Sequence, residues 1–116
     1  MNRAYLFFGW KIDTGLALRY LEEEIADQYD WFYSEIDDNV FLTHACPASG
    51  LNIFDCEFYV VMGEPRILPY DPDDMFDLLR DRALLDRAWG VCKRVCRFPP
   101  DVRFTSPEIH AVVHFY

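Results

Sequence analysis

Three histidines and two carboxylates have the residue types that acid–base or ligand-binding chemistry requires. His44, His110 and His114 each lie in an apolar run that predicts a β-strand, and Asp55 and Glu57 lie in a third run of this kind. If these strands share one face of a sheet, a small-ligand or enzymatic pocket could contain His44, Asp55, Glu57 and His110.

Metal-binding and nucleophile patterns are incomplete in this sequence. His44 and Cys46 lie two residues apart, about 6.5 Å along one strand face, but no further ligand is predicted beside them. Ser49 lies near His44 and Asp55, yet outside the strand-turn-helix context of a nucleophile elbow. Five scattered glycines form no phosphate-binding loop. We therefore expect no catalytic set, no metal and no cofactor.

Cys92 and Cys96 are four residues apart on a predicted helix, so they lie on the same helical face. Their parallel Cα–Cβ directions disfavour an unstrained disulfide. Both lie beside the apolar Val91 and Val95. We interpret the two cysteines as small buried hydrophobic residues rather than as zinc ligands.

The triplet Asp13-Thr14-Gly15 resembles the Asp-Thr-Gly motif of retroviral-type aspartic proteases, which are homodimers of about this chain length. The resemblance implies a loop within an all-β fold, in which each subunit contributes one carboxylate to a shared dyad. Here the triplet follows a single predicted strand and leads into a helical pattern over residues 16–21, and no glycine-rich flap is found. Asp13 or Thr14 is therefore predicted to cap a helix.

Strands and helices alternate along the chain. Strict alternation of apolar side chains predicts a strand over residues 4–12, and apolar residues at steps of three and four predict a helix from residue 14 towards residue 36. The far end of this helix, from residue 31, could leave the helix because its aromatic residues fit either period. The runs 40–46 and 51–62 predict a hairpin around a Pro-Ala-Ser-Gly loop, with Cys46 opposite Leu51.

The second half of the chain predicts helix and then strand. Asp71 and Pro72 are a strong helix start. Apolar residues before and after Arg82 point in different directions, which predicts a bend, or two successive helices. A short strand is expected around Val102 to Phe104, and residues 109–116 form the last long strand.

This order of elements is that of ferredoxin-like α+β domains, with the split β-α-β-β-α-β arrangement. Right-handed crossovers would arrange a four-stranded antiparallel sheet in the order 4-1-3-2, with the helices on one face. A length of 116 residues is that of a single domain.

The opposite sheet face would collect aromatic and aliphatic side chains, which a soluble monomer rarely leaves exposed. We therefore expect a non-enzymatic interaction domain that forms a homodimer, or binds another protein, through this open face. The expected interface residues are Tyr5, Phe7, Leu42, Ile53, Tyr59, His114 and Tyr116.

A net charge of -9 argues against direct binding to nucleic acid or to an anionic membrane. The same acidity leaves open a nucleic-acid mimic that blocks a basic partner. In such a mimic, a row of aspartates would imitate the phosphates of a duplex. That row is Asp71, Asp73, Asp74, Asp77 and Asp81. Neither a secretion signal nor an apolar run of bilayer length is seen, so we expect an intracellular, soluble (cytoplasmic) protein with four reduced cysteines.

Overall fold

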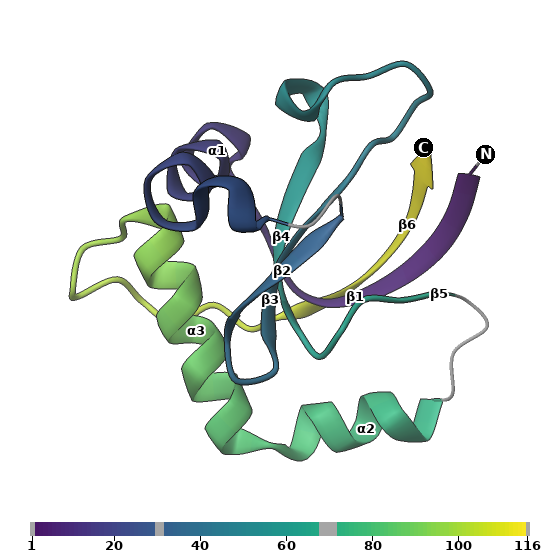
Figure 1. The fold of residues 1–116 in the computed structure, drawn as a ribbon. Coiled ribbons are helices and arrows are strands. Elements are labelled where there is room, and N and C mark those ends of the chain that lie inside the picture. The colour runs from purple at the N-terminus through teal and green to yellow at the C-terminus, as the bar shows by residue number, and fades with distance from the viewer. Residues whose placement is uncertain (1, 30–31, 68–71, 116) are drawn as a thin grey trace.

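The computed structural model describes residues 2–29, 32–67 and 72–115 (Figure 1). Within them, six strands form one antiparallel sheet, in which β2-β3-β4-β1-β5 is one path and β6 also pairs with β1. The strands are β1 (Asn2–Ile12), β2 (Tyr33–Asp37), β3 (Val40–Ala45), β4 (Glu57–Met62), β5 (Arg66–Ile67) and β6 (Glu108–Phe115). The α-helices are α1 (Thr14–Tyr20), α2 (Pro72–Arg80) and α3 (Arg82–Cys96).

The ferredoxin-like prediction is wrong, because the sheet contains β2 and β5 in addition to the four expected strands. The expected neighbours β6-β1-β4-β3 are present. Most of β2 lies in the segment that was predicted as the far end of the first helix, or as chain that leaves it. β5 lies in a segment that was predicted as a loop. The short strand expected at Val102 to Phe104 is a loop.

The first helix ends much earlier than its apolar stripe predicts. The Asp13 side chain accepts a hydrogen bond from the Leu16 N–H at 2.9 Å, so the predicted cap of α1 is confirmed. After α1 the chain forms a π-helical turn, Leu21–Ile25, and a 3₁₀ turn, Ala26–Gln28. Ala26 has a φ of 53°, which lies outside the right-handed helical region. The chain then leaves the helix and forms β2.

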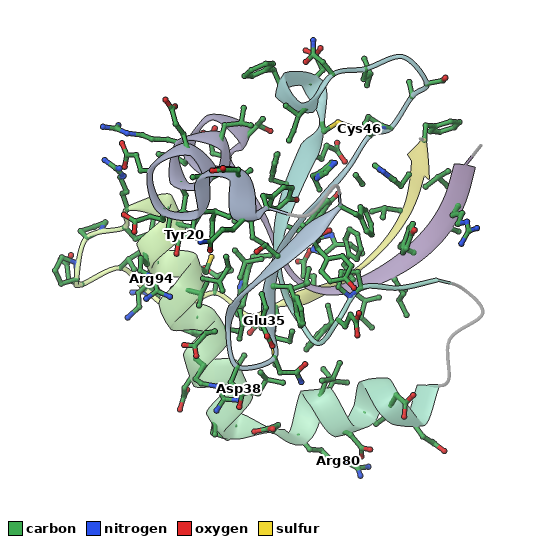
Figure 2. The ribbon with its side chains drawn as sticks, in the orientation of Figure 1. Tyr20, Glu35, Asp38, Cys46, Arg80 and Arg94 are labelled. Atoms are coloured by element: carbon green, nitrogen blue, oxygen red, sulfur yellow. A yellow bond between two sulfur atoms is a disulfide. The ribbon has the colours of Figure 1, made fainter. Side chains whose placement is uncertain are left out.

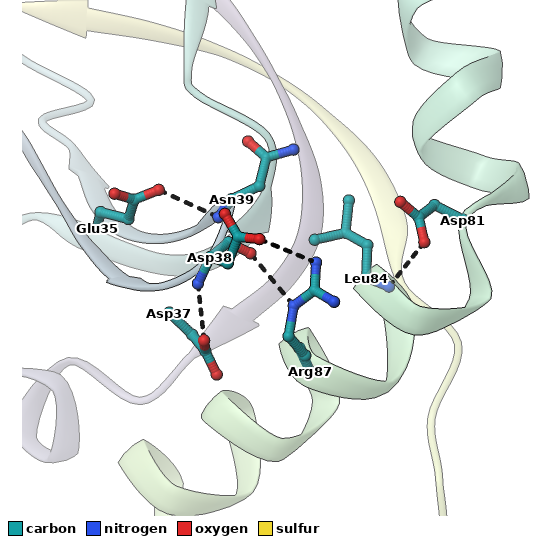
Figure 3. Close-up of polar contacts among 7 residues, drawn as sticks. All are labelled: Glu35, Asp37, Asp38, Asn39, Asp81, Leu84 and Arg87. Atoms are coloured by element: carbon teal, nitrogen blue, oxygen red, sulfur yellow. Dashed lines mark hydrogen bonds and ion pairs between the residues drawn. The ribbon is translucent and has the colours of Figure 1, made fainter.

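The break in the second helical segment lies where it was expected. α2 ends at Arg80 and α3 begins at Arg82, after Asp81 caps it by accepting a hydrogen bond from the Leu84 N–H (Figure 3). The predicted cap at Asp71 lies outside the described residues. On α3, Arg87 lies 4.0 Å from the Asp38 carboxylate in the turn between β2 and β3.

The main core lies between the sheet and the helices α1 and α3. It contains the even-numbered face of β1, with Phe8, Trp10 and Ile12, as the alternation predicts. It also contains the buried residues of α3, including Leu84, Ala88 and Val91 as well as both cysteines of that helix. Burial of each large apolar side chain stabilises the fold by about 1.5–3 kcal/mol.

The odd-numbered face of β1 lies in a second buried cluster, which corrects the expectation of an open sheet face. Tyr5, Phe7 and Tyr59 pack there with Phe32, which is 2% exposed. The sheet curls, and the Phe115 N–H at the end of β6 donates to the Cys46 carbonyl just after β3 at 3.0 Å. Figure 1 shows β1 and β6 curving together. The aromatic face therefore lies inside the monomer.

The β3–β4 hairpin has a different register from the one predicted. Ala45 pairs with Glu57, Leu42 pairs with Val60, and the connection contains a 3₁₀ turn, Ile53–Asp55. The apolar run 51–62 therefore contributes a strand in its second half and a longer loop in its first half. This shift puts Leu42 in the main core, on the face opposite to the expected interface.

Candidate functional site

An open groove of about 510 Å³ runs beside β6. One side follows five consecutive residues of that strand, Ile109 to Val113, and the other includes Ala45 at the end of β3 and Pro47 after it. Lys11, Glu57 and Tyr59 also line it. The groove exists because β6 contacts the end of β3 at Phe115 and diverges from it toward Glu108.

The polar side chains of the groove form a connected network. Lys11 Nζ lies 3.0 Å from Glu57 Oε1, and the Tyr59 hydroxyl donates to Glu57 Oε2 at 3.0 Å. The His110 ring lies 5.1 Å from that of Tyr59, and its Nε2 lies 3.3 Å from the Gly9 carbonyl oxygen. Both carboxylate oxygens of Glu57 are therefore already bonded within the chain.

Protonation in this network follows from its contacts. The hydrogen bond from Lys11, helped by that from Tyr59, lowers the pKa of Glu57 despite its partial burial. Burial raises the pKa of Tyr59, and the bond to Glu57 raises it further. At neutral pH Glu57 is a bonded carboxylate and Tyr59 keeps its proton, so neither is poised as a base or a nucleophile.

The outer edge of β6 presents unpaired backbone groups. β6 pairs with β1 from Phe115 to Glu108, and Phe115 directs its N–H away from β1, toward Cys46. Because alternate residues of a strand point their backbone groups to the same edge, Ile109, Ala111 and Val113 also present theirs outward. In the described part of the chain, this outer edge makes one backbone hydrogen bond, that of Phe115.

The same three residues expose their side chains. Ile109 is 55% exposed and Val113 45% exposed, and Ala111 is also exposed. They lie on the face of the β1–β6 pair opposite to Tyr5 and Phe7. The exposed apolar surface of this sheet is therefore on the other face from the one that the sequence predicts.

His44 and His114 form a second titratable group, buried away from solvent. Their ring centroids are 5.4 Å apart, and they are 5% and 3% exposed. His114 Nδ1 accepts a hydrogen bond from the Cys46 N–H at 2.9 Å, and His44 Nδ1 lies 2.8 Å from the Tyr29 hydroxyl. Burial and repulsion from His114 lower the pKa of His44 to about 4, and burial lowers the pKa of His114.

Cys46 and Cys56 form a disulfide across the start of the β3–β4 loop (Figure 2), so the prediction of four reduced cysteines is wrong for this pair. The two residues continue the strand register beyond Ala45 and Glu57 and so lie opposite each other. Cys46 also bonds to β6 through its N–H and its carbonyl. The disulfide therefore holds the loop at the point where the sheet curls.

Reduction of this disulfide is expected to destabilise the fold by about 3 kcal/mol, because it removes the constraint on a ten-residue loop in the unfolded chain. Urea denaturation with and without a phosphine reductant measures the loss. The double variant Cys46→Ala/Cys56→Ala is the control and should show no response to the reductant. An equal response in that variant would assign the effect to another cause.

The expected interface residues are distributed over several environments. Tyr5, Phe7, Tyr59 and His114 lie on the inner face, Leu42 lies in the main core, and Ile53 is half-buried in the loop. Tyr116 lies outside the described residues. The structure does not bring these side chains together on one exposed surface.

The expected ligand-binding residues are also separated. Glu57 and His110 line the groove, whereas His44 is buried beside His114, and Asp55 is exposed in the 3₁₀ turn. The sequence reasoning missed the outer edge of β6 as a site. Its available signal was the absence of lysine and proline from Ile109 to Phe115, residues that commonly protect an exposed edge.

Four carboxylates line a second open cleft, of about 530 Å³, between β2, the loop after β4, and α2. They belong to Glu35, Glu64, Asp74 and Asp77. Glu35 accepts a hydrogen bond from the Asn39 N–H (Figure 3). Asp73 and Asp81 are exposed nearby in sequence, and Asp71 lies outside the described residues.

Within residues 2–29, 32–67 and 72–115, no three histidine, cysteine or acidic side chains are grouped as a metal site would require. Over the same ranges, no helix combines the length and apolar character needed to cross a membrane. Comparisons with protein families, curated proteins and solved structures find no match. The groove and the outer edge of β6 are therefore the features of this chain that bear on its function.

Proposed function

We propose that this chain is a non-enzymatic interaction domain that forms a homodimer by antiparallel pairing of β6 with β6 of a second copy. The observation that carries the proposal is the outer edge of β6, an eight-residue strand whose exposed apolar residues lie beside outward-facing backbone groups. Natural monomers usually protect such an edge with charge, proline or a covering segment.

The edge is self-complementary about Ala111. A two-fold axis at Ala111 places Ile109 of one copy opposite Val113 of the other, and the outward backbone groups of these residues then bond in pairs. The contacts on the exposed face, Ile109 with Val113 and Ala111 with Ala111, are apolar, and the seven residues from Ile109 to Phe115 include no acidic or basic residue other than histidine. A second copy therefore matches this edge without an unpaired charge.

The alternative of a ligand-binding or enzymatic pocket has weaker support, because the internal network already uses both oxygens of Glu57. An intracellular location remains a prediction. The Cys46–Cys56 disulfide favours an oxidising compartment instead.

Ala111→Lys is expected to convert the dimer to a monomer, because it places two like charges directly opposite each other at the two-fold axis. Ala111 is exposed, so the fold should tolerate the change. Sedimentation equilibrium at micromolar concentration measures the association. Phe76→Lys is the control: it adds the same charge at a 51%-exposed apolar residue of α2 and should leave the dimer intact.

A monomeric wild-type protein under these conditions would refute the proposal. So would a dimer of unchanged affinity in Ala111→Lys. Loss of association in Phe76→Lys, with Ala111→Lys unaffected, would move the interface to α2.

A further inference from the structure

A pocket of about 370 Å³ opens at the edge of the main core, between β1, α1, α3 and the loop after α3. Its walls are mainly aromatic and aliphatic, with Trp10, Leu16, Trp89 and Phe98. Cys92 and Cys96 also line it. The burial of these two cysteines agrees with the sequence interpretation, but the pocket gives their thiols a route to solvent that a closed core would not.

The two thiols are neighbours in space as well as in sequence. They lie one turn apart on the same face of α3, are 2% and 7% exposed, and are both free of disulfides.

Two sulfur ligands without a third donor restrict the metal that could bind. Among the described residues, no third histidine, cysteine or carboxylate completes a cluster with them, whereas zinc sites require four ligands. Thiolates are soft ligands and select soft ions such as copper(I), for which two thiolates form a stable linear complex. The chemistry of the pair therefore fits a soft monovalent ion.

Two features of the surroundings, the end of α3 and the aromatic rings, attract a cation to this place. Cys96 is the last residue of α3, where the aligned carbonyl groups of a helix attract cations. The Asp13 carboxylate lines the same pocket, and so does Lys11, whose positive charge offsets that of the carboxylate. The rings of Trp10 and Trp89, 5.6 Å apart, add aromatic faces that attract cations and exclude water.

We propose that Cys92 and Cys96 bind one copper(I) ion through their two sulfur atoms at the base of this aromatic pocket. Two Cu–S bonds form and two S–H bonds break, and both protons pass to solvent. The copper remains in the +1 state, so the step needs neither an oxidant nor a reductant. This site is independent of the β6 edge.

The test uses the full chain with its Cys46–Cys56 disulfide intact, under anaerobic conditions with ascorbate, and copper(I) supplied as its bicinchoninate complex. We expect the protein to remove one copper per chain from the chelator, and more effectively at higher pH because binding releases protons. Trp10 and Trp89 line the site, so the tryptophan fluorescence should fall in proportion to the copper bound.

Cys92→Ser and Cys96→Ser should each lose this binding, whereas Cys46→Ala/Cys56→Ala should still bind one copper. Cooperative urea unfolding of each variant confirms that it is folded. If a serine variant does not fold, silver(I) titration of the wild type, with one equivalent quenching the fluorescence, provides the second measurement. Failure of the wild type to compete with bicinchoninate, or equal binding by folded serine variants, would overturn the proposal.

Discussion

Gly9→Ala is expected to destabilise the protein by more than about 3 kcal/mol, or to prevent its folding. A Cβ at this position would lie 1.9 Å from the Val60 carbonyl oxygen and 2.8 Å from the Val61 Cα. Both are backbone atoms of β4, which is paired with β1 on one side and with β3 on the other. No side-chain rotation can relieve this contact, so the strands themselves would have to separate.

The position also explains the size of the expected effect. Gly9 lies where β1 pairs with Val61 on one edge and Glu108 on the other, so it joins both halves of the curled sheet. Separation of β1 from β4 at this point would disturb the main core and the inner aromatic cluster together.

Gly90→Ala is the matched control. Gly90 is exposed in the interior of α3, and an added Cβ there meets no atom within 4 Å. Alanine is a better helix former than glycine, so this variant should be about 0.5–1 kcal/mol more stable. Urea denaturation measures both changes. Wild-type stability in Gly9→Ala would show that β1 and β4 are not in such close contact.

Acidification is expected to remove up to about 3 kcal/mol of stability as the pH falls from about 6.5 to about 4. In the unfolded chain His44 has the ordinary pKa of 6.5, so it takes up a proton in this range. In the folded chain the pKa of His44 is about 4, so the ring stays neutral. Because the unfolded state binds more protons, stability is present above the unfolded pKa and is lost below it. The lowered pKa of His114 acts in the same direction.

Burial is the main reason that these rings resist a proton, and their hydrogen bonds and mutual repulsion agree with it. His114 Nδ1 accepts the Cys46 N–H, so a proton on that nitrogen would remove the acceptor that links β6 to β3. The Tyr29 hydroxyl donates to the Phe32 carbonyl, so His44 Nδ1 must donate to the Tyr29 oxygen. Protonation of both rings would also place two positive charges with centroids 5.4 Å apart in a buried site.

His44→Asn should reduce the dependence of stability on pH between pH 6.5 and pH 5, even if the variant is less stable at neutral pH. The quantity to compare is the slope of the unfolding free energy against pH. The lowered pKa of Glu57 contributes to acid loss at still lower pH, so this window separates the two effects. Val91→Ala, in the main core, is the control: it removes no titratable group and should keep the wild-type slope. An unchanged slope in His44→Asn would assign the acid sensitivity elsewhere.

Local signals in the sequence were sufficient for several elements. The even-numbered face of β1, the cap at Asp13 and the break near Arg82 each depend on residues within a few positions of one another, and each is confirmed. Two neighbours of β1, the strands β4 and β6, were also predicted from the order of the elements, whereas the third, β5, was not. These features are determined by side-chain periodicity and by the chemistry of helix ends, which act before the chain is compact.

The site depended on contacts between distant residues. An odd shift in the β3–β4 register moved Leu42 to the opposite face, because side chains alternate at every residue of a strand. The disulfide between Cys46 and Cys56 follows from the same register, since it places these residues opposite each other.

Residues 4–12 show the division most clearly. Their alternation by itself determined that β1 has one core face, and that Tyr5 and Phe7 share the other. The tertiary structure decided what that second face contacts: the sheet curls until β6 meets the end of β3, and Tyr5 and Phe7 become an inner cluster. Curling depends on the close approach at Gly9 and on the pairing of segments about a hundred residues apart. It moves the exposed apolar surface from the aromatic face of β1 to the outer edge of β6.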